Sequence, residues 1–321
     1  MGEGSKIVKL NKVVVTGGAG FIGANLCRHL TETHPSCAVV AYDNLSSGLR
    51  SNLDGLDNVE LVEGDILDQP RFTQALADAS AVVHLAARPS VPKSIQDPRA
   101  THDNNATGTL AVLEAMRAAE ITRVVVASSS SVYGANPTLP KVETMTPMPV
   151  SPYAVSKLAT ESYALSYQRV FGFEAVAFRF FNVFGPLQRA DHDYAAVVPA
   201  FVAAALAGRP IPIHGDGGQT RDFTYVGSVA EVITETLTAG LHADTPVNLA
   251  FGTRYSLLEV VDLLEKILGR PLERAHTGPR AGDVRDSQAD QTALRAMVPH
   301  LTPVDLESGL RRTIAWFESM P

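Results

Sequence analysis

Residues 12–23 read KVVVTGGAGFIG, and this stretch decides the fold. A valine run is typical of a buried parallel strand, and the glycines follow it at the point where an amphipathic helix begins. Gly17 and Gly20 allow a tight turn and a close approach of the backbone to a ligand, while Gly23 lets the helix pack on the sheet. The loop therefore predicts a site for a dinucleotide pyrophosphate at the helix N-terminus. The alternative is a set of glycines that only form a turn.

The pattern that begins here continues to about residue 180. Short valine-rich runs alternate with segments of helical periodicity, which is typical of parallel strands joined by crossover helices. We therefore expect an α/β protein with a doubly wound parallel sheet in residues 12–180. A smaller α/β lobe would come mainly from residues 181–321, with the chain crossing between the two, and residues 1–11 look like an extension or tag. Within the lobe, helices are predicted at 195–207, 257–268 and 305–318.

Charge and cysteine content exclude several classes of protein. The net charge is −7 and the pI is about 5.7, which disfavours nucleic-acid and anionic-membrane surfaces because both need clustered Lys and Arg. Cys27 and Cys37 match neither a zinc pattern nor a disulfide framework, so we expect no metal site and a reducing cytoplasm. No apolar run reaches the roughly 20 residues of a membrane span.

Two acidic residues follow the next predicted strands. Asp43 ends AVVAYD, where a carboxylate can accept hydrogen bonds from a ribose hydroxyl, so it favours NAD; an arginine there would favour NADP. Asp65, in EGDI, lies where it can either contact an adenine or cap the chain. The predicted cofactor is therefore NAD.

A serine run and a Tyr-Lys pair supply candidate chemistry. RVVVASSSS is a strand that delivers residues 128–131 to the carboxyl edge of the sheet, where ligands of doubly wound folds bind. In SPYAVSK, Tyr153 and Lys157 share one helix face, with Ser151 and Pro152 as N-terminal residues. A phenol has an ordinary pKa of about 10, and a nearby cation makes it a better base. An isolated Y-x-x-x-K is usually a surface pair, but the glycine loop upstream favours the catalytic interpretation.

These motifs together carry a family resemblance. TGGAGFIG, DNLSSG, GDI, HLAA, NATGT, SSSSVYG, SPYAVSK, RFFNVFGP, TRDF and RAGDVR occur in the order and spacing of the extended short-chain dehydrogenase/reductases that modify nucleotide sugars. The match spans residues 12–318 and most resembles the bacterial UDP-hexose 4-epimerases. The resemblance implies a Rossmann fold with NAD, a UDP-sugar substrate and a homodimer. Its interface would form from helices at 104–119 and 153–171.

What the resemblance implies for catalysis involves three residues. Tyr153 would remove the proton of the sugar 4-hydroxyl while C4 passes hydride to NAD. Lys157 would lower the pKa of that tyrosine and bind the nicotinamide ribose, and Ser129 would hydrogen-bond the 4-oxygen. The 4-keto sugar would then turn and take hydride back on its other face, which inverts C4 without net oxidation.

The resemblance also implies the binding residues. Arg221 and Arg280 match the pyrophosphate arginines and Asn182 matches a donor to the diphosphate, with surface pairing or capping as the alternative for each. Asn105 is expected to support the cofactor-binding core. The expected cofactor residues are Gly17, Gly20, Phe21, Ile22, Gly23, Asp43, Asn44, Asp65, Ile66, Leu85, Ala86, Ala87, Tyr153 and Lys157. The expected substrate residues are Arg88, Ser130, Ser131, Asn182, Arg189, Arg221, Arg280, Asp283 and Ser287.

The serines after Ser129 bear on the reaction. Related 4,6-dehydratases carry Asp-Glu where this chain has Ser130 and Ser131, and related decarboxylases carry Glu at the second position. Without a carboxylate to deprotonate C5, inversion at C4 is favoured over dehydration. A plain dehydrogenase and a non-catalytic NAD sensor are further alternatives, although a sensor typically lacks the tyrosine or lysine.

Two residues point to different substrates. Ser287 lies where a bulky tyrosine narrows the pocket in some relatives, so a 2-N-acetyl group would fit, whereas Arg189 lies where glucuronate-specific relatives place an arginine. UDP-glucose, UDP-GlcNAc and UDP-glucuronate all stay open. Gly227 and Ser228 replace acidic residues of relatives, and Asp286 replaces a histidine near the expected nucleotide pocket.

Overall fold

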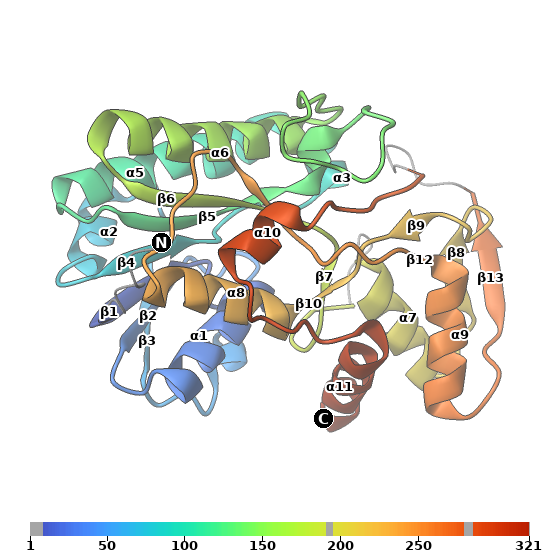
Figure 1. Cartoon of the computed structure of the whole chain (residues 1–321). Helices are drawn as coiled ribbons and strands as arrows, with labels where there is room; N and C mark the ends of the chain where they lie inside the picture. The colour runs from blue at the N-terminus through green and yellow to red at the C-terminus, as the bar shows by residue number, and fades with distance from the viewer. Residues whose placement is uncertain (1–8, 191–194, 279–284, 321) are drawn as a thin grey trace.

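The computed structural model describes residues 9–190, 195–278 and 285–320. A seven-stranded parallel sheet forms its centre, in the order β11-β6-β5-β4-β1-β2-β3 (Figure 1). The predicted doubly wound fold is therefore confirmed. The strands are β1 (Lys12–Thr16), β2 (Ala38–Asp43), β3 (Val59–Glu63), β4 (Ala81–His84), β5 (Arg123–Ser129), β6 (Glu174–Phe180) and β11 (Val247–Leu249).

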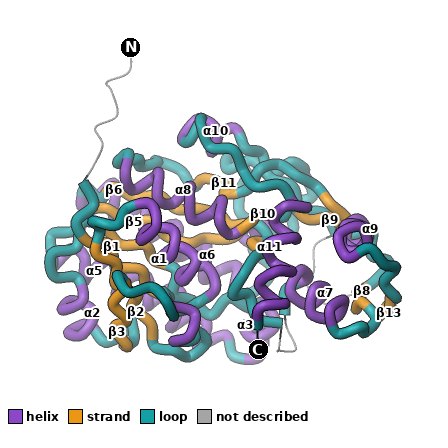
Figure 2. Tube along the Cα trace, turned by 90° about the horizontal axis from the view of Figure 1, so that it is seen from below, coloured by secondary structure: helices purple, strands orange, loops and turns teal. Residues whose placement is uncertain are grey.

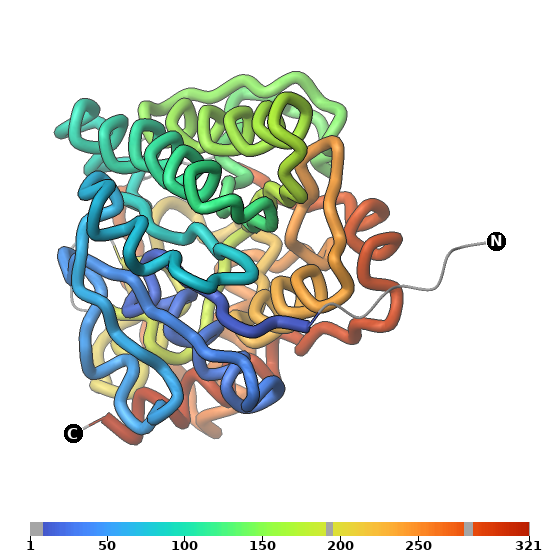
Figure 3. Tube along the Cα trace, turned by 90° about the vertical axis from the view of Figure 1, so that its left-hand side faces the viewer, coloured from blue at the N-terminus to red at the C-terminus, as the bar shows by residue number. Residues whose placement is uncertain are grey.

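Helices cover both faces of this sheet, which explains why its strands are valine-rich throughout. Val13 and Val15 of β1 enter the core on one face and Val14 enters the core on the other, as the alternation of side chains along a strand requires. Figure 2 shows α1 and α8 lying over the strands on the first face. Figure 3 shows α5 and α6 side by side as an outer layer. The covering helices are α1 (Phe21–Thr33), α2 (Gln69–Ala75), α5 (Gly108–Ala118), α6 (Pro152–Phe171) and α8 (Val226–Thr238).

The chain returns to the sheet after residue 180. β11 pairs with β6 in parallel, with Val247 opposite Phe178, and α8 packs against α1. The sequence pattern did not indicate α8, because VGSVAEVITETLT is rich in β-branched residues that favour strands. Burial of one face against α1 outweighs that propensity.

A smaller lobe lies beyond the carboxyl ends of the strands. Its core is formed by α7 (Val197–Leu206), β8 (Ile211–His214), α9 (Leu257–Leu268), β13 (Arg274–Thr277) and α11 (Leu306–Ser319). The three helices expected in this lobe are confirmed to within two residues at each end. α9 begins at a reciprocal capping box between Ser256 and Glu259 and ends at Gly269 in the left-handed conformation. Phe21 and Ile22 of α1 pack against the core of the lobe, so the lobe contacts the N-terminal end of α1.

Shorter elements lie between these strands and helices. One of them, η2, is a single π-helical turn that leads directly into α5. The connecting elements are η1 (Arg50–Leu53), α3 (Val91–Gln96), α4 (Pro98–His102), η2 (Asp103–Thr107), η3 (Ser130–Tyr133), β7 (Val183–Phe184), β9 (Thr220–Arg221), β10 (Thr224–Tyr225), β12 (Tyr255–Ser256) and α10 (Thr292–Met297). None of the helices in the described ranges is long and apolar enough to cross a membrane.

Candidate active site

The glycine loop closes tightly on the loop after β4. Gly17 has φ +69°, and a Cβ there would come within 2.8 Å of the backbone N of Ala86. A Cβ on Gly23 would lie 2.1 Å from the carbonyl oxygen of Gly17. Only glycine fits at these two positions, because a side chain would collide with backbone atoms that cannot move aside.

The N-terminus of α1 fits a dinucleotide pyrophosphate. Gly20 is its N-cap, no side chain caps it, and its first turn contains no acidic residue. The N–H groups of Phe21, Ile22 and Gly23 belong to the first turn of this helix, where no intrahelical acceptor exists. A bare turn of backbone donors at the positive end of a helix dipole is the donor set that an anionic diphosphate needs.

Asp43 lies beside this loop at the end of β2. Its carboxylate accepts hydrogen bonds from the backbone N–H groups of Ala19, at 3.0 Å, and Leu45, at 2.8 Å. Burial raises the pKa of Asp43, and these backbone bonds oppose the rise. Each carboxylate oxygen retains acceptor capacity, so Asp43 can both shape the loop and accept a ribose hydroxyl.

The turn after β3 is held by side-chain contacts. Asn44 donates to the carboxylate of Asp65 at 2.9 Å, and the other oxygen of Asp65 accepts from the N–H of Leu67. Ile66 is buried, and a Cβ on Gly108 would meet its side chain at 2.5 Å. Asp65 therefore closes the turn, and Ile66 is a core residue that could reach a ligand only through its backbone.

Leu85, Ala86 and Ala87 follow β4 and face the glycine loop. The N–H of Ala86 donates to Thr16 Oγ1. The next residue, Arg88, donates its backbone N–H to the side-chain oxygen of Asn105 at 2.7 Å. Asn105 is buried and also donates to Ser156 Oγ at 2.9 Å, so it joins this loop to α6.

Ser129 and Tyr153 come together at the carboxyl end of β5. Ser129 is the last residue of β5, and its side chain lies next to the Tyr153 phenol. Burial raises the pKa of Tyr153, and the neighbouring Ser129 hydroxyl lowers it. The Ser129 Oγ also accepts from the backbone N–H of Ser131, 3.2 Å away, and from its hydroxyl, 2.9 Å away.

Lys157 lies one turn further along α6. The helix begins as expected, with Ser151 as N-cap accepting from the N–H of Ala154 and Pro152 as the first helical residue. Lys157 is 5% exposed, and its Nζ donates to the carbonyl oxygen of Ala127 at 2.8 Å. Burial lowers the pKa of the lysine to about 8. The pKa of Tyr153 lies above its ordinary value, because burial outweighs the effect of Ser129.

Behind this pair lies a buried ion pair that the sequence did not indicate. Arg179 of β6 donates to both carboxylate oxygens of Glu161 on α6, at 3.0 and 2.7 Å, and both side chains are under 5% exposed. Ser128 donates to the same carboxylate at 2.7 Å. The Arg179 guanidinium lies over the ring of Tyr133, 4.7 Å from its centroid. These contacts anchor the strand end that carries Ser129.

His84 is the second buried group that sequence reasoning missed. Its Nδ1 is 2.8 Å from Thr16 Oγ1 and its Nε2 is 3.1 Å from Thr109 Oγ1. Burial, with a smaller contribution from Lys157, lowers its pKa to about 3, so the imidazole is neutral at pH 7. The sequence signal that could have identified His84 is its position as a polar residue at the carboxyl end of a strand, where ligands of this fold bind.

Two of the predicted substrate residues line one cavity at the lobe. Asn182 and Arg221 both contribute to a cavity of about 180 Å³ between β7, β9 and α7. Asn182 has φ +30°, which is unusual outside glycine, and its side chain donates to the carbonyl of Asp222 at 3.3 Å. Arg221 is buried and donates to the carbonyls of Thr220 and Arg285.

Other predicted substrate residues within the described ranges are Ser287, Ser130, Ser131 and Arg189. Ser287 is 7% exposed, and its N–H donates to the carbonyl of Thr220. Ser130 and Ser131 begin η3, and Arg189 is exposed. Arg280 and Asp283 fall outside the described residues.

Comparisons with known proteins agree with this geometry. A model of the family described as NAD dependent epimerase/dehydratase matches residues 13–250. The UDP-glucose 4-epimerase of Mycolicibacterium smegmatis is 37% identical, over 96% of this chain and 99% of that protein. The chain belongs to the NAD-dependent epimerase/dehydratase family.

Solved structures of the family match almost the whole chain. The UDP-N-acetylglucosamine 4-epimerase from Methanobrevibacter ruminantium M1, solved in complex with UDP-N-acetylmuramic acid, has a TM-score of 0.90 and 35% identity, covering 97% of this chain and 99% of that chain. TunA, an NAD-dependent NDP-hexosamine 5,6-dehydratase, has a TM-score of 0.87 and 31% identity, with the same coverage. These matches confirm the resemblance to extended short-chain dehydrogenase/reductases.

Ser228 and Asp286, two residues that depart from the family pattern, both form contacts with other segments of the chain. Ser228 is buried in the first turn of α8, and its hydroxyl accepts from the N–H of Val304 at 2.9 Å. Asp286 accepts from Thr220 Oγ1 at 2.6 Å and forms an ion pair with Arg254 at 3.1 Å. Ser228 therefore ties α8 to the segment before α11, and Asp286 ties two segments of the lobe together.

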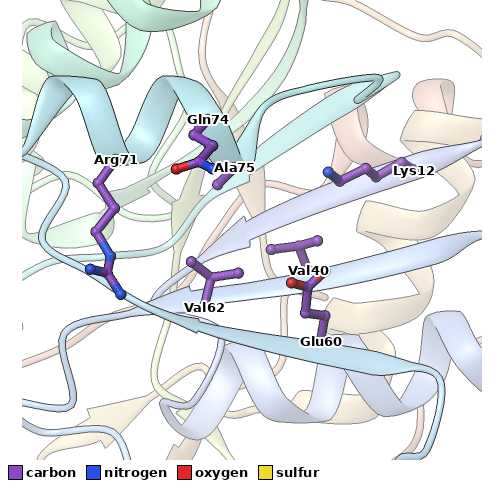
Figure 4. Close-up of a pocket in the computed structure, with 7 residues that line it drawn as sticks. All are labelled: Lys12, Val40, Glu60, Val62, Arg71, Gln74 and Ala75. Carbon is purple, nitrogen blue, oxygen red and sulfur yellow. The ribbon is translucent and has the colours of Figure 1, made fainter.

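A second cavity, of about 410 Å³, lies apart from these residues. It opens between α2 and strands β1 to β3 (Figure 4). Lys12, at the amino end of β1, borders it and donates to the carbonyl of Ala77. Its lining residues are Lys12, Val40, Glu60, Val62, Arg71, Gln74 and Ala75. None of them is an expected cofactor or substrate residue.

Proposed function

We propose that this protein is an NAD-dependent UDP-sugar 4-epimerase that inverts C4 through a transient 4-keto sugar. The observation that carries the proposal is the pairing of the Ser129 hydroxyl with the Tyr153 phenol at the carboxyl end of β5, with the buried Lys157 amine one helical turn away. The two residues after Ser129 are serines, so the turn that leaves β5 offers no carboxylate to remove a C5 proton.

The roles of these side chains follow from their chemistry. Tyr153 accepts the proton of the sugar 4-hydroxyl, and Ser129 donates a hydrogen bond to the same oxygen. Lys157, with a pKa of about 8, is mainly protonated at pH 7, and it contributes a cation that no described carboxylate neutralises. Burial of Tyr153 opposes ionisation, so the site must be completed by further positive charge before the phenolate is favoured.

NAD, when bound, supplies the hydride acceptor and donor for C4 together with that positive charge. The first turn of α1 would bind its diphosphate, and Asp43 would accept a hydrogen bond from a ribose hydroxyl. In this proposal residues 12–180 form most of the NAD-binding domain and residues 181–321 mainly the nucleotide-sugar lobe. α8 and β11 come from the second half of the chain but pack on the sheet of the first. This supports a division in which the chain crosses between the two parts.

The lobe holds the UDP moiety. Asn182 and Arg221 line one cavity, where an amide and a guanidinium match the oxygens of a diphosphate. Ser287 leaves room for a 2-N-acetyl group, and Arg189 offers a cation to a C6 carboxylate. The proposal therefore covers UDP-glucose, UDP-GlcNAc and UDP-glucuronate.

Proton NMR of the anomeric signals tests the function. Purified protein is incubated separately with the three UDP-sugars without added NAD, and conversion of one to its C4 epimer is expected. Tyr153→Phe should lower kcat by about 10²- to 10⁴-fold, while retaining the protein's fold by circular dichroism. A 4-keto or unsaturated product would replace the epimerase by a dehydratase, the activity that TunA's name gives for that relative. Accumulation of NADH would indicate a plain dehydrogenase.

The proposal includes a homodimer formed through α5 and α6. Apolar side chains remain exposed on α6, among them Val155, 51% exposed, and Val170, 67% exposed. Light scattering should give a dimer at micromolar concentration and a monomer for Val155→Glu with Val170→Glu; a monomeric parent protein would remove the proposal. Both cysteines are free thiols, which is in keeping with the cytoplasmic location that we also propose.

A further inference from the structure

We propose that Ser131 is a positioning residue that fixes the Ser129 hydroxyl as a hydrogen-bond donor toward Tyr153 and the sugar 4-oxygen. This inference rests on the proposed function and gives Ser131 a task other than contacting the sugar. Its basis is the arrangement of donors around one oxygen atom.

The Ser129 Oγ receives two hydrogen bonds from the same residue. The backbone N–H of Ser131 donates to it at 3.2 Å, and the Ser131 hydroxyl donates to it at 2.9 Å. A hydroxyl has one proton and two lone pairs. Because both lone pairs accept from Ser131, the Ser129 proton is left as the only group that can bond outward.

The outward neighbour of Ser129 is Tyr153. The Ser129 hydroxyl lowers the pKa of the Tyr153 phenol, against the effect of burial. A bond has this effect when it favours the phenolate, which can only accept. The same donor direction stabilises negative charge on the sugar 4-oxygen as its proton leaves.

The backbone explains why residue 131 holds this position. Ser129 is extended, with φ −153° and ψ 146°, and the chain then turns into the short 3-10 helix η3. This turn points the N–H of residue 131 back at the Ser129 side chain whatever that residue is, so the backbone bond survives substitution. The second bond needs a donor on the side chain of residue 131. An alanine would leave one lone pair open and let the Ser129 proton rotate away.

Charged neighbours do not provide the same effect. Among the described residues, the pKa of Tyr153 responds to burial and to Ser129, and to no charged side chain. Lys157 on the same helix is turned toward the carbonyl of Ala127, and His84, across from it, is neutral at pH 7. The direction of the Ser129 proton is therefore one local influence on Tyr153 ionisation, in addition to burial and to the positive charge that bound NAD would supply.

The test compares Ser131→Ala with Ser131→Thr, which keeps a hydroxyl, and with Ser51→Ala, which removes the hydroxyl of an exposed serine in η1. Near-ultraviolet titration of the holoenzyme follows tyrosinate formation, and the matching Tyr153→Phe background is subtracted to isolate Tyr153. We expect Ser131→Ala to raise the Tyr153 pKa by roughly half a unit to one unit, the value of one hydrogen bond. Ser131→Thr and Ser51→Ala should leave it unchanged.

Kinetics supply the second readout. With Ser131→Ala, kcat at pH 7 should fall about 3- to 10-fold, KM should stay constant, and the acid limb of kcat should move to higher pH. Ser131→Thr should restore all three. A raised KM with unchanged kcat would overturn the proposal, since Ser131 would then be a sugar ligand, and so would an unchanged Tyr153 titration. The titration needs no turnover, so it distinguishes failure of this inference from failure of the epimerase assignment.

Discussion

The Nζ of Lys157 donates a hydrogen bond to the carbonyl oxygen of Ala127, 2.8 Å away, two residues before Ser129 on the same strand. This bond fixes the amine below the strand end that carries the catalytic hydroxyl. No carboxylate among the described residues compensates for the burial of the amine, and burial lowers its pKa from 10.5 to about 8. Keeping this buried amine protonated at neutral pH therefore lowers the stability of the folded protein.

The lowered pKa of Lys157 predicts a dependence of stability on pH. Between about pH 8 and pH 10.5, the unfolded lysine binds a proton that the folded lysine has lost, so the free energy of unfolding rises with pH in this window. Lys157→Met does not titrate and should not show this rise. The difference between wild type and variant should change by about 3 kcal/mol across the window.

Urea unfolding at several pH values measures this difference, and other titrating groups cancel because both proteins share them. Parallel stability curves would show that Lys157 keeps an ordinary pKa in the folded protein.

The glycine loop predicts a contrast between two substitutions. Gly23→Ala places a Cβ 2.1 Å from the Gly17 carbonyl, so the loop must shift and bound NAD should be lost. Gly278→Ala meets no atom within 4 Å and serves as the control, with unchanged NAD content. The absorbance and enzymatic assay of NAD released from denatured protein give the measurement. Full NAD occupancy in Gly23→Ala would show that the loop tolerates displacement.

Local patterns explain which parts were predictable from sequence. The glycine loop, the cap at Ser151 and the Tyr153–Lys157 pair each lie within a few residues, so spacing alone predicts their geometry. α8 was not predictable, because its β-branched residues favour a strand and only packing against α1 makes it helical.

Contacts between distant residues were beyond sequence reasoning. Glu161 and Arg179 meet because α6 lies across β6, and no spacing rule relates the two. The partners of Ser131 depend on the turn that begins at Ser129, which the serine run does not reveal. The bond of Lys157 to Ala127 likewise follows from how α6 packs on β5.

For the buried Glu161–Arg179 pair, we expect a large loss of stability when only one partner is removed. Glu161→Ala leaves the guanidinium of Arg179 and the Ser128 hydroxyl without their acceptor, which should cost about 3–5 kcal/mol in the free energy of unfolding. Replacing both partners, as Glu161→Leu with Arg179→Met, should recover most of this loss. Glu63→Ala breaks an exposed pair with Arg50 and should have little effect. Urea unfolding provides all three values, and a small loss in Glu161→Ala would mean that water reaches Arg179.

The raised pKa of Asp222 predicts a pH dependence of stability that is opposite in sign to that of Lys157. Its carboxylate accepts from the N–H of Ala289 and the hydroxyl of Thr253, each at 3.0 Å, yet burial raises its pKa from 3.8 to about 6. Between about pH 4 and pH 6 the folded state binds the proton more tightly than the unfolded state, so stability falls as pH rises through this window.

Asp222→Asn should abolish this fall, since an amide does not titrate. Relative to wild type, its free energy of unfolding should increase by up to about 3 kcal/mol from pH 4 to pH 7, whatever the constant cost of the lost acceptor. Asp222 directly follows Arg221 and binds the segment at Ala289. The same variant should therefore also disturb Arg221 and raise KM for the UDP-sugar. A pH-independent stability difference from wild type would place the Asp222 pKa at its ordinary value, and the carboxylate would then be solvated rather than buried between these segments.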